Sequence, residues 1–241
     1  MDFTYEQIAK MIDHSLLNPT IPVENLERGI QVALDYQVAS VCIMPYYARR
    51  CAELLAGSQV IPGTVIGFPH GVHSTSIKIK EAEQALEDGC IELDMVVNIS
   101  QVLSGGWEYV RQDIKGVVDA AHARQAKVKV IFENCYLNEA QKIRLCEICG
   151  EIGADWVKTS TGFGTGGATN EDLILMRAHS PAHVQVKAAG GIRSLERLLE
   201  VRALGVTRCG ATATVAILEE ARRQLGLPSI AAGQEQRVTG Y

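Results

Sequence analysis

The sequence predicts an α/β fold of the (β/α)8 barrel class, the TIM barrel, built as a single domain. Three observations predict it. Short β-branched, apolar runs alternate with amphipathic runs of helical length. Eight strand-like runs occur within 241 residues, the usual size of such a barrel. These runs are almost continuously apolar, which is typical of parallel strands buried on both faces.

The predicted elements follow one another in order along the chain. The strand-like runs cover residues 12–17, 38–44, 60–68, 91–98, 127–133, 155–159, 184–188 and 206–210. Helical runs between them include residues 23–36, 74–88, 109–124, 138–152, 170–179 and 194–204. Pro22 and Ser194 are helix start signals, and Gly89, Gly153 and Gly205 are helix end signals. This alternation predicts βαβ units and a parallel sheet.

An open, doubly wound sheet is the competing architecture. It favours a glycine-rich turn after the first strand, whereas this chain has Asn18-Pro19-Thr20 there. No linker, low-complexity segment or change of composition divides the chain. We therefore expect the barrel to cover residues 1–227, followed by a flexible, polar tail over residues 228–241.

Composition and charge exclude several classes of protein. The chain is 47% hydrophobic and 21% charged, which is too apolar for a disordered chain. No apolar run reaches the ~18 residues of a membrane span, and the start lacks the cationic region of a signal peptide. A net charge of −5 without a basic block gives no footprint for nucleic acid. We expect a soluble, cytoplasmic protein that binds neither nucleic acid nor membranes.

The seven cysteines argue for a reducing compartment, because their number is odd and the chain is not small. Cys146 and Cys149 form a C-x-x-C, but their neighbours indicate a helix. No second pair follows at zinc spacing. We interpret these two thiols as structural, and we expect neither a metal nor a cofactor.

Charged residues stand near the ends of four successive predicted strands. They are Asp94, Lys129, Lys158 and Lys187. A charge inside a buried strand is costly unless it is paired or functional, and barrel chemistry lies at the carboxyl ends of strands. We expect these side chains to converge on one pocket. The alternative is that each lysine points outward between helices, with its ammonium group in solvent.

Such a cluster would support amine catalysis. A lysine attacks a carbonyl only when its amine is neutral, so its pKa of ~10.4 must fall. Burial and a second ammonium group lower it. Lys158 would be the nucleophile, Lys187 the neighbour that lowers its pKa, and Asp94 a proton relay.

Glycine-rich loops follow the last three strands. The segment 162–167 matches G-x-G-x-x-G, but it lies late in the chain and lacks the acidic residue of a dinucleotide site. Loops after the seventh and eighth strands of a barrel often bind phosphate. The alternative is that these glycines only form tight turns. The predicted phosphate-binding residues are Gly162, Gly190, Gly191, Gly210, Ala211 and Thr212.

Four segments together make the sequence closely similar to the deoxyribose-phosphate aldolase family, and the resemblance covers most of the chain between Ile12 and Thr212. They are Glu92-Leu93-Asp94-Met95-Val96-Val97-Asn98, Lys129-Val130-Ile131-Phe132-Glu133, Val157-Lys158-Thr159-Ser160-Thr161-Gly162-Phe163-Gly164 and Val186-Lys187-Ala188-Ala189-Gly190-Gly191-Ile192-Arg193.

The resemblance implies a class I aldolase that reversibly cleaves 2-deoxy-D-ribose 5-phosphate to D-glyceraldehyde 3-phosphate and acetaldehyde. Lys158 matches the family's Schiff-base lysine, and Asp94 and Lys187 match its proton-relay pair. The partners would be small phosphorylated sugars and aldehydes, and the protein would be a homo-oligomer, either a dimer or a tetramer. Further residues are expected to line the same pocket, namely Asp13, Ser15, Cys42, Lys129 and Thr161.

Some positions depart from the family pattern. Ser15 stands where threonine is usual, Asn18 where a basic residue is usual, and Asn134 and Thr212 replace threonine and serine. The loop after the third strand is richer in histidine, with His70 and His73, which we interpret as loop residues. These departures concern substrate range and rate more than reaction type.

Two alternatives and one further candidate remain. A non-catalytic phosphosugar-binding barrel would need the glycine loops but neither Lys158, Lys187 nor Asp94. A Schiff-base aldolase or a thiolase acting on another phosphorylated substrate is the second alternative. The chain ends in Tyr241, as do some members of the resembled family, and its phenol is a candidate for proton transfer.

Overall fold

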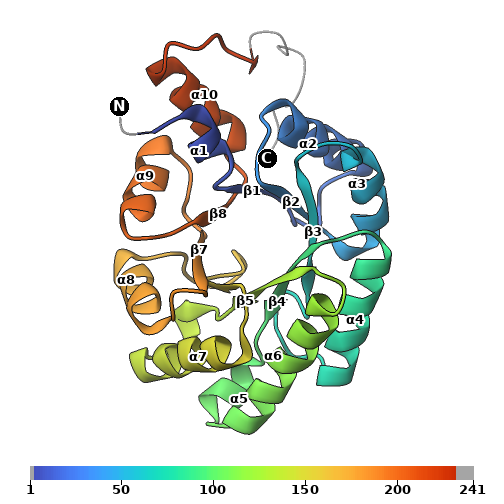
Figure 1. The fold of residues 1–241 in the computed structure, drawn as a ribbon, viewed down its shortest axis with the longest axis vertical. Coiled ribbons are helices and arrows are strands. Elements are labelled where there is room, and N and C mark those ends of the chain that lie inside the picture. Colours follow the sequence, from blue (N-terminus) through green and yellow to red (C-terminus); the bar gives the residue numbers. More distant parts are fainter. Residues whose placement is uncertain (1–2, 232–241) are drawn as a thin grey trace.

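The computed structural model describes residues 3–231. Its eight strands are all parallel and close into a barrel in chain order, β1 beside β8 (Figure 1). The predicted barrel fold is therefore confirmed. The strands are β1 (Ile12–Leu16), β2 (Ser40–Ile43), β3 (Ile61–Ile66), β4 (Glu92–Val96), β5 (Lys127–Ile131), β6 (Trp156–Lys158), β7 (Gln185–Ala189) and β8 (Arg208–Ala211).

The helices surround the strands, as Figure 1 shows. Six of the α-helices lie where the sequence predicts them, namely α2 (Val23–Asp35), α4 (Thr75–Glu87), α6 (Trp107–His122), α7 (Glu139–Ile152), α8 (Asn170–His179) and α9 (Leu195–Ala203). The others are α1 (Tyr5–Ala9), α3 (Ala48–Leu55), α5 (Ile99–Leu103) and α10 (Thr214–Gln224), with short 3-10 turns η1 (Pro45–Tyr47) and η2 (Asn134–Tyr136). Within residues 3–231, no helix has the length and apolar character needed to cross a membrane.

Local signals in the sequence explain where the helices begin and end. The Ser194 hydroxyl accepts a hydrogen bond from the Arg197 N–H at 3.1 Å and caps α9. Gly153 ends α7 with a φ of +83°, a conformation that glycine adopts without strain. The observed strands are mostly shorter at one or both ends than the predicted runs, because the apolar sequence continues into buried loops.

Alternation along the strands places apolar and polar residues in different parts of the molecule. In β4, Leu93 and Met95 belong to the hydrophobic core, while Glu92 and Asp94 are buried apart from it. The core therefore lies between the strands and the helices, and the barrel interior is polar. The register places Asp94 opposite Lys129, and Lys158 opposite Lys187.

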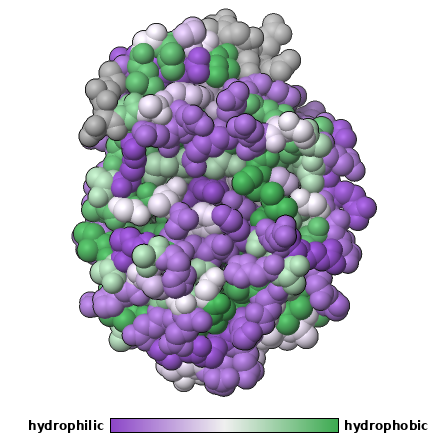
Figure 2. Space-filling model, viewed as in Figure 1, coloured by the Kyte–Doolittle hydropathy of each residue, from purple (hydrophilic) through white to green (hydrophobic). Residues whose placement is uncertain are grey.

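The surface and the thiols agree with this arrangement. Hydrophilic residues cover most of the face shown in Figure 2, and hydrophobic residues form small patches between them. Cys146 and Cys149 are both buried in α7. All seven cysteines are free. The structural interpretation of the C-x-x-C pair thus fits its surroundings.

Candidate active site

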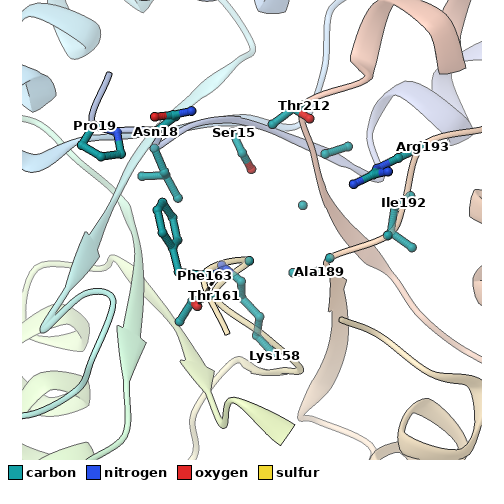
Figure 3. Close-up of a pocket in the computed structure, with 16 residues that line it drawn as sticks. Ser15, Asn18, Pro19, Lys158, Thr161, Phe163, Ala189, Ile192, Arg193 and Thr212 are labelled. Atoms are coloured by element: carbon teal, nitrogen blue, oxygen red, sulfur yellow. Dashed lines mark hydrogen bonds between the residues drawn. The ribbon is translucent and has the colours of Figure 1, made fainter. Parts of the chain in front are cut away.

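A cavity of about 440 Å³ opens at the carboxyl ends of β1, β6, β7 and β8. This volume falls in the range of small-molecule sites. Figure 3 shows Lys158 extending into it, with Phe163 and Arg193 on opposite sides. The lining residues are Ser15, Leu17, Asn18, Pro19, Lys158, Thr161, Gly162, Phe163, Ala189, Gly190, Gly191, Ile192, Arg193, Gly210, Ala211 and Thr212.

Two lysines share one carboxylate oxygen at the floor of this cavity. Lys158 Nζ and Lys187 Nζ each lie 2.7 Å from Asp94 Oδ2. Lys129 Nζ binds the other oxygen, Asp94 Oδ1, at 3.0 Å. All four side chains are buried. The alternative that the lysines point outward into solvent is therefore wrong for these three residues.

The two lysines that share Asp94 differ in their electrostatic surroundings. Burial, aided by the Lys187 ammonium group, lowers the pKa of Lys158 against the opposing effect of Asp94. Burial also acts to lower the pKa of Lys187, but Asp13 and Asp94 outweigh it, and the pKa is raised. Asp13 Oδ2 lies 2.5 Å from Lys187 Nζ. Lys187 is therefore held as a cation beside an amine that loses its proton more easily.

Asp13, Cys42 and Lys129, which we expected in the pocket, are buried and do not line the cavity. Asp13 Oδ2 lies 3.3 Å from Lys129 Nζ, in addition to its contact with Lys187. Burial raises the pKa of the Cys42 thiol to about 11, so it stays neutral near neutral pH. Ser15 and Thr161, by contrast, do line the cavity.

The predicted phosphate-binding residues line the cavity together. Gly190 and Gly191 have φ values of +82° and +89°, so other residues would be strained there. The Gly190 carbonyl accepts the Ala168 N–H at 3.1 Å, which ties the loop after β7 to the loop after β6. Gly162, Gly210, Ala211 and Thr212 complete this side of the cavity. The wall is rich in backbone groups and suits an anion.

The fold and the site can now be compared with known proteins. A family model described as "DeoC/LacD family aldolase" matches residues 7–218. The chain belongs to this family. A deoxyribose-phosphate aldolase from Rhodopirellula baltica is 63% identical over 229 residues, 95% of each protein. One from Thermococcus gammatolerans is 48% identical over 217 residues, 89% of this chain and 96% of that protein.

A solved structure from Aeropyrum pernix, described as a tetrameric deoxyribose phosphate aldolase, has a TM-score of 0.84 at 32% identity. The match covers 92% of this chain and 93% of that one. The resemblance to this family is thereby confirmed, and the protein is a DeoC/LacD-family aldolase. The roles of individual residues rest on the geometry.

Sequence reasoning missed several residues of the site. Arg193 lines the cavity and was quoted only within a motif. Glu133 is buried, and its carboxylate accepts both the N–H and the hydroxyl of Thr161. Glu92 and Arg208 are buried inside the barrel. The signal for Glu133 and Glu92 was the same as for Asp94, a charged residue in an apolar strand.

The departures from the family pattern fall in different places. Asn18 lines the cavity, whereas the buried Asn134 donates to Met176 Sδ at 3.3 Å, within the shell of the barrel. His70 and His73 do not line the cavity, and His73 Nδ1 lies 3.7 Å from Glu81. Tyr241 lies outside the described residues. Among residues 3–231, no group of three or more His, Cys, Asp or Glu side chains could hold a metal.

Proposed function

We propose that this protein is a class I aldolase that reversibly cleaves 2-deoxy-D-ribose 5-phosphate to D-glyceraldehyde 3-phosphate and acetaldehyde. One observation carries the proposal. The buried Lys158 amine lies at the cavity floor, 2.7 Å from an Asp94 oxygen that Lys187 also binds. The family's relatives named deoxyribose-phosphate aldolase support the choice of substrate.

The first step is attack of the neutral Lys158 amine on the C1 aldehyde. Loss of water then gives an iminium ion between C1 and Nζ. Lys187 stays charged and disfavours a second ammonium group beside it. Asp94 accepts hydrogen bonds from both amines, so a proton can pass through it between Lys158 and Lys187.

The iminium ion then acts as the electron sink. When the C3 hydroxyl loses its proton, the C2–C3 bond breaks and its electron pair moves into the iminium group. D-Glyceraldehyde 3-phosphate leaves, and an enamine remains on Lys158. Protonation at C2 and addition of water at C1 release acetaldehyde and restore the amine. Asp94 and Lys187 supply and remove the protons of these steps.

The substrate phosphate would lie against the wall formed by the loops after β7 and β8. Backbone N–H groups of Gly191 and Ala211 are available on that side, and Arg193 adds a fixed positive charge. Asn18, Phe163 and Pro19 lie on the cavity wall as well and would bound the sugar chain.

Borohydride trapping tests this function. Incubation with deoxyribose 5-phosphate and borohydride should produce a reduced adduct whose mass maps to Lys158. Lys158→Arg keeps the charge but cannot form an imine, so both trapping and turnover should disappear while the circular dichroism spectrum is unchanged. Full trapping in that variant would show that another residue is the nucleophile.

We also propose that the protein works in the cytoplasm as a homo-oligomer, a dimer or a tetramer. Seven free cysteines support a reducing compartment. The relative from Aeropyrum pernix, described as tetrameric, supports an oligomer. Light scattering coupled to size-exclusion chromatography should give a mass of two or four times 26.2 kDa. A monomer mass at micromolar concentration would contradict this.

A further inference from the structure

The barrel interior below the cavity floor holds an ion-pair network where branched apolar side chains are usual. Arg208, the first residue of β8, donates from Nη1 to Glu92 Oε2 at 2.9 Å and from Nη2 to Glu92 Oε1 at 3.1 Å. Arg208 Nη1 also lies 2.6 Å from Asp13 Oδ1. This floor pair, Glu92 and Arg208, does not touch the cavity.

The floor pair is joined to Lys158 by a continuous series of contacts. Lys129 Nζ lies 2.5 Å from Glu92 Oε2 and 3.0 Å from Asp94 Oδ1. Asp94 binds Lys158 through its other oxygen at 2.7 Å. Asp13 bridges Arg208 and Lys187 in the same way. The charges of the floor therefore act on the reactive amine through a buried medium, where screening by water is weak.

Every strand that faces this network can be included in the charge count. β1 contributes Asp13, β4 Glu92 and Asp94, β5 Lys129, β6 Lys158, β7 Lys187 and β8 Arg208, while β2 supplies the neutral Cys42 and Ser40 and β3 no charged residue. Apart from Lys158, the three carboxylates face three cations. With a neutral Lys158 the interior therefore carries no net charge, and with a protonated Lys158 it carries one positive charge.

Other charged groups lie outside this set. Glu133 sits above the network and is hydrogen bonded to Thr161. Lys127 is exposed, with its Nζ 5.3 Å from the centroid of the Trp156 ring. Lys10 is partly buried and donates to the carbonyls of Val38 and Gln59. None of these three is bonded to a member of the network in the described part of the chain.

We propose that Glu92 and Arg208 are positioning residues that set the charge balance of the barrel interior, so that the interior is neutral when the Lys158 amine is free to attack. The inference rests on the proposed function, since it explains how the nucleophile is prepared. Stability alone does not call for the floor pair, because well-packed apolar residues can replace buried ion pairs without loss of stability. The floor pair instead contributes a fixed potential to the buried amine.

The charge balance makes a prediction of opposite signs for the two residues. Glu92→Gln removes a negative charge and should move the pH midpoint of imine formation downward by about 1 pH unit. Arg208→Gln removes a positive charge and should move the midpoint upward by a similar amount. The double variant restores the balance, so its midpoint should return to that of the unaltered protein. A purely structural role would lower the extent of reaction in both variants without opposite shifts.

The measurement is the pH dependence of cyanoborohydride trapping with acetaldehyde, with the adduct at Lys158 quantified by mass spectrometry. Arg208→Lys keeps the charge and should keep the midpoint. Asp172→Asn is the matched control, because it breaks a largely buried ion pair with Lys142 between α7 and α8, away from the barrel interior. It should lower stability without moving the midpoint.

The outcomes separate this inference from the proposed function. Absence of trapping at Lys158 in the unaltered protein overturns the proposed function. Trapping at Lys158 with midpoints that stay fixed, or move in the same direction, in Glu92→Gln and Arg208→Gln overturns only the charge balance. If either single variant fails to fold, the double variant and Arg208→Lys decide, and a shift of more than about half a pH unit in either contradicts the proposal.

Discussion

At the residue scale, the structure gives two identical side chains opposite electrostatic behaviour. Lys158 and Lys187 bind the same oxygen of Asp94, yet the pKa of Lys158 is lowered and that of Lys187 is raised. Burial acts on both in the same direction. The difference follows from Asp13, whose carboxylate lies 2.5 Å from Lys187 Nζ. A single additional carboxylate thus separates the nucleophile from the permanent cation.

Replacing Lys187 should raise the pKa of Lys158. In Lys187→Leu the neighbouring positive charge is gone, while the Asp94 carboxylate that favours ammonium remains. The pH profile of imine formation should therefore move to more alkaline values, with about 1.4 kcal/mol for each pH unit. The measurement is borohydride trapping from pH 5 to 10. An unchanged or acid-shifted profile would mean that Lys187 acts in another way, for example on the phosphate.

His14 is a second residue whose surroundings determine its charge. Its side chain is buried on β1, and Nδ1 lies 2.7 Å from the Thr214 hydroxyl on α10. Burial lowers the pKa of His14 to about 4, because no carboxylate offsets the loss of solvent. In the unfolded chain the same imidazole titrates near pH 6.5. Between these values, the unfolded state binds a proton that the folded state does not.

This difference predicts how stability depends on pH. Stability should rise with pH wherever the unfolded state binds more protons, so it should fall as the pH drops from about 6.5 to 4. The loss from His14 alone should be about 3 kcal/mol, given 1.4 kcal/mol per pH unit. In His14→Gln this loss should be absent, so its Tm should vary less over that interval. Equal slopes of Tm against pH in both proteins would contradict the prediction.

At the scale of an element, the end of β5 shows how a strand positions a neighbouring loop. Glu133 adopts the left-handed region, with φ of 57° and ψ of 62°, which is uncommon for a residue other than glycine. This turn directs its carboxylate to the N–H of Thr161, 3.2 Å away, and to the Thr161 hydroxyl. Thr161 in turn accepts the Phe163 N–H at 3.0 Å. The shape of the loop after β6 therefore depends on β5.

Removing the Glu133 carboxylate should disturb catalysis more than folding. In Glu133→Ala, the buried Thr161 N–H loses its partner, which costs about 1–3 kcal/mol, and the loop that lines the cavity is released. We expect kcat/KM to fall by about tenfold to a hundredfold, with imine formation at Lys158 still detectable. The exposed Glu139→Ala is the control and should be unaffected. A Glu133→Ala enzyme with full activity would show that Glu133 is not needed to order the loop.

At the scale of the whole molecule, apolar and charged residues occupy separate compartments. The apolar core lies between the strands and the helices, and the ion-pair network fills the barrel interior below the cavity. This separation lets the barrel keep its stability in the outer shell while the interior carries charges suited to chemistry. Parallel strands make it possible, since alternate residues point to opposite sides of one sheet.

The tail provides a prediction that concerns the molecule beyond its described residues. Because residues 228–241 form a polar, glycine-containing sequence that ends in Tyr241, we expect it to reach the barrel mouth. Deleting Tyr241 should leave Tm unchanged and slow deuterium exchange into the methyl group of acetaldehyde by about tenfold, or about 1.4 kcal/mol. Exchange at the full-length rate after deletion would exclude a catalytic role for Tyr241.

The sequence by itself determined the fold class and the identity of the reactive groups. Alternation of apolar runs with amphipathic ones reflects burial on both faces of parallel strands, and this pattern is local enough to be read directly. Lys158, Lys187 and Asp94 stood out because charged residues are rare in buried strands. The short helices α1 and α5 were missed, since five residues are too few to show a helical period.

Only the tertiary structure decided how these groups act on one another. The sequence does not show that Lys158 and Lys187 share one oxygen, nor that Asp13 reaches Lys187, because these contacts join strands far apart in the chain. Glu92 and Arg208 are 116 residues apart, and their pairing depends on the closure and register of the barrel. The direction of each pKa shift depends on those distances and on burial. Three-dimensional proximity therefore decides which lysine is free to react.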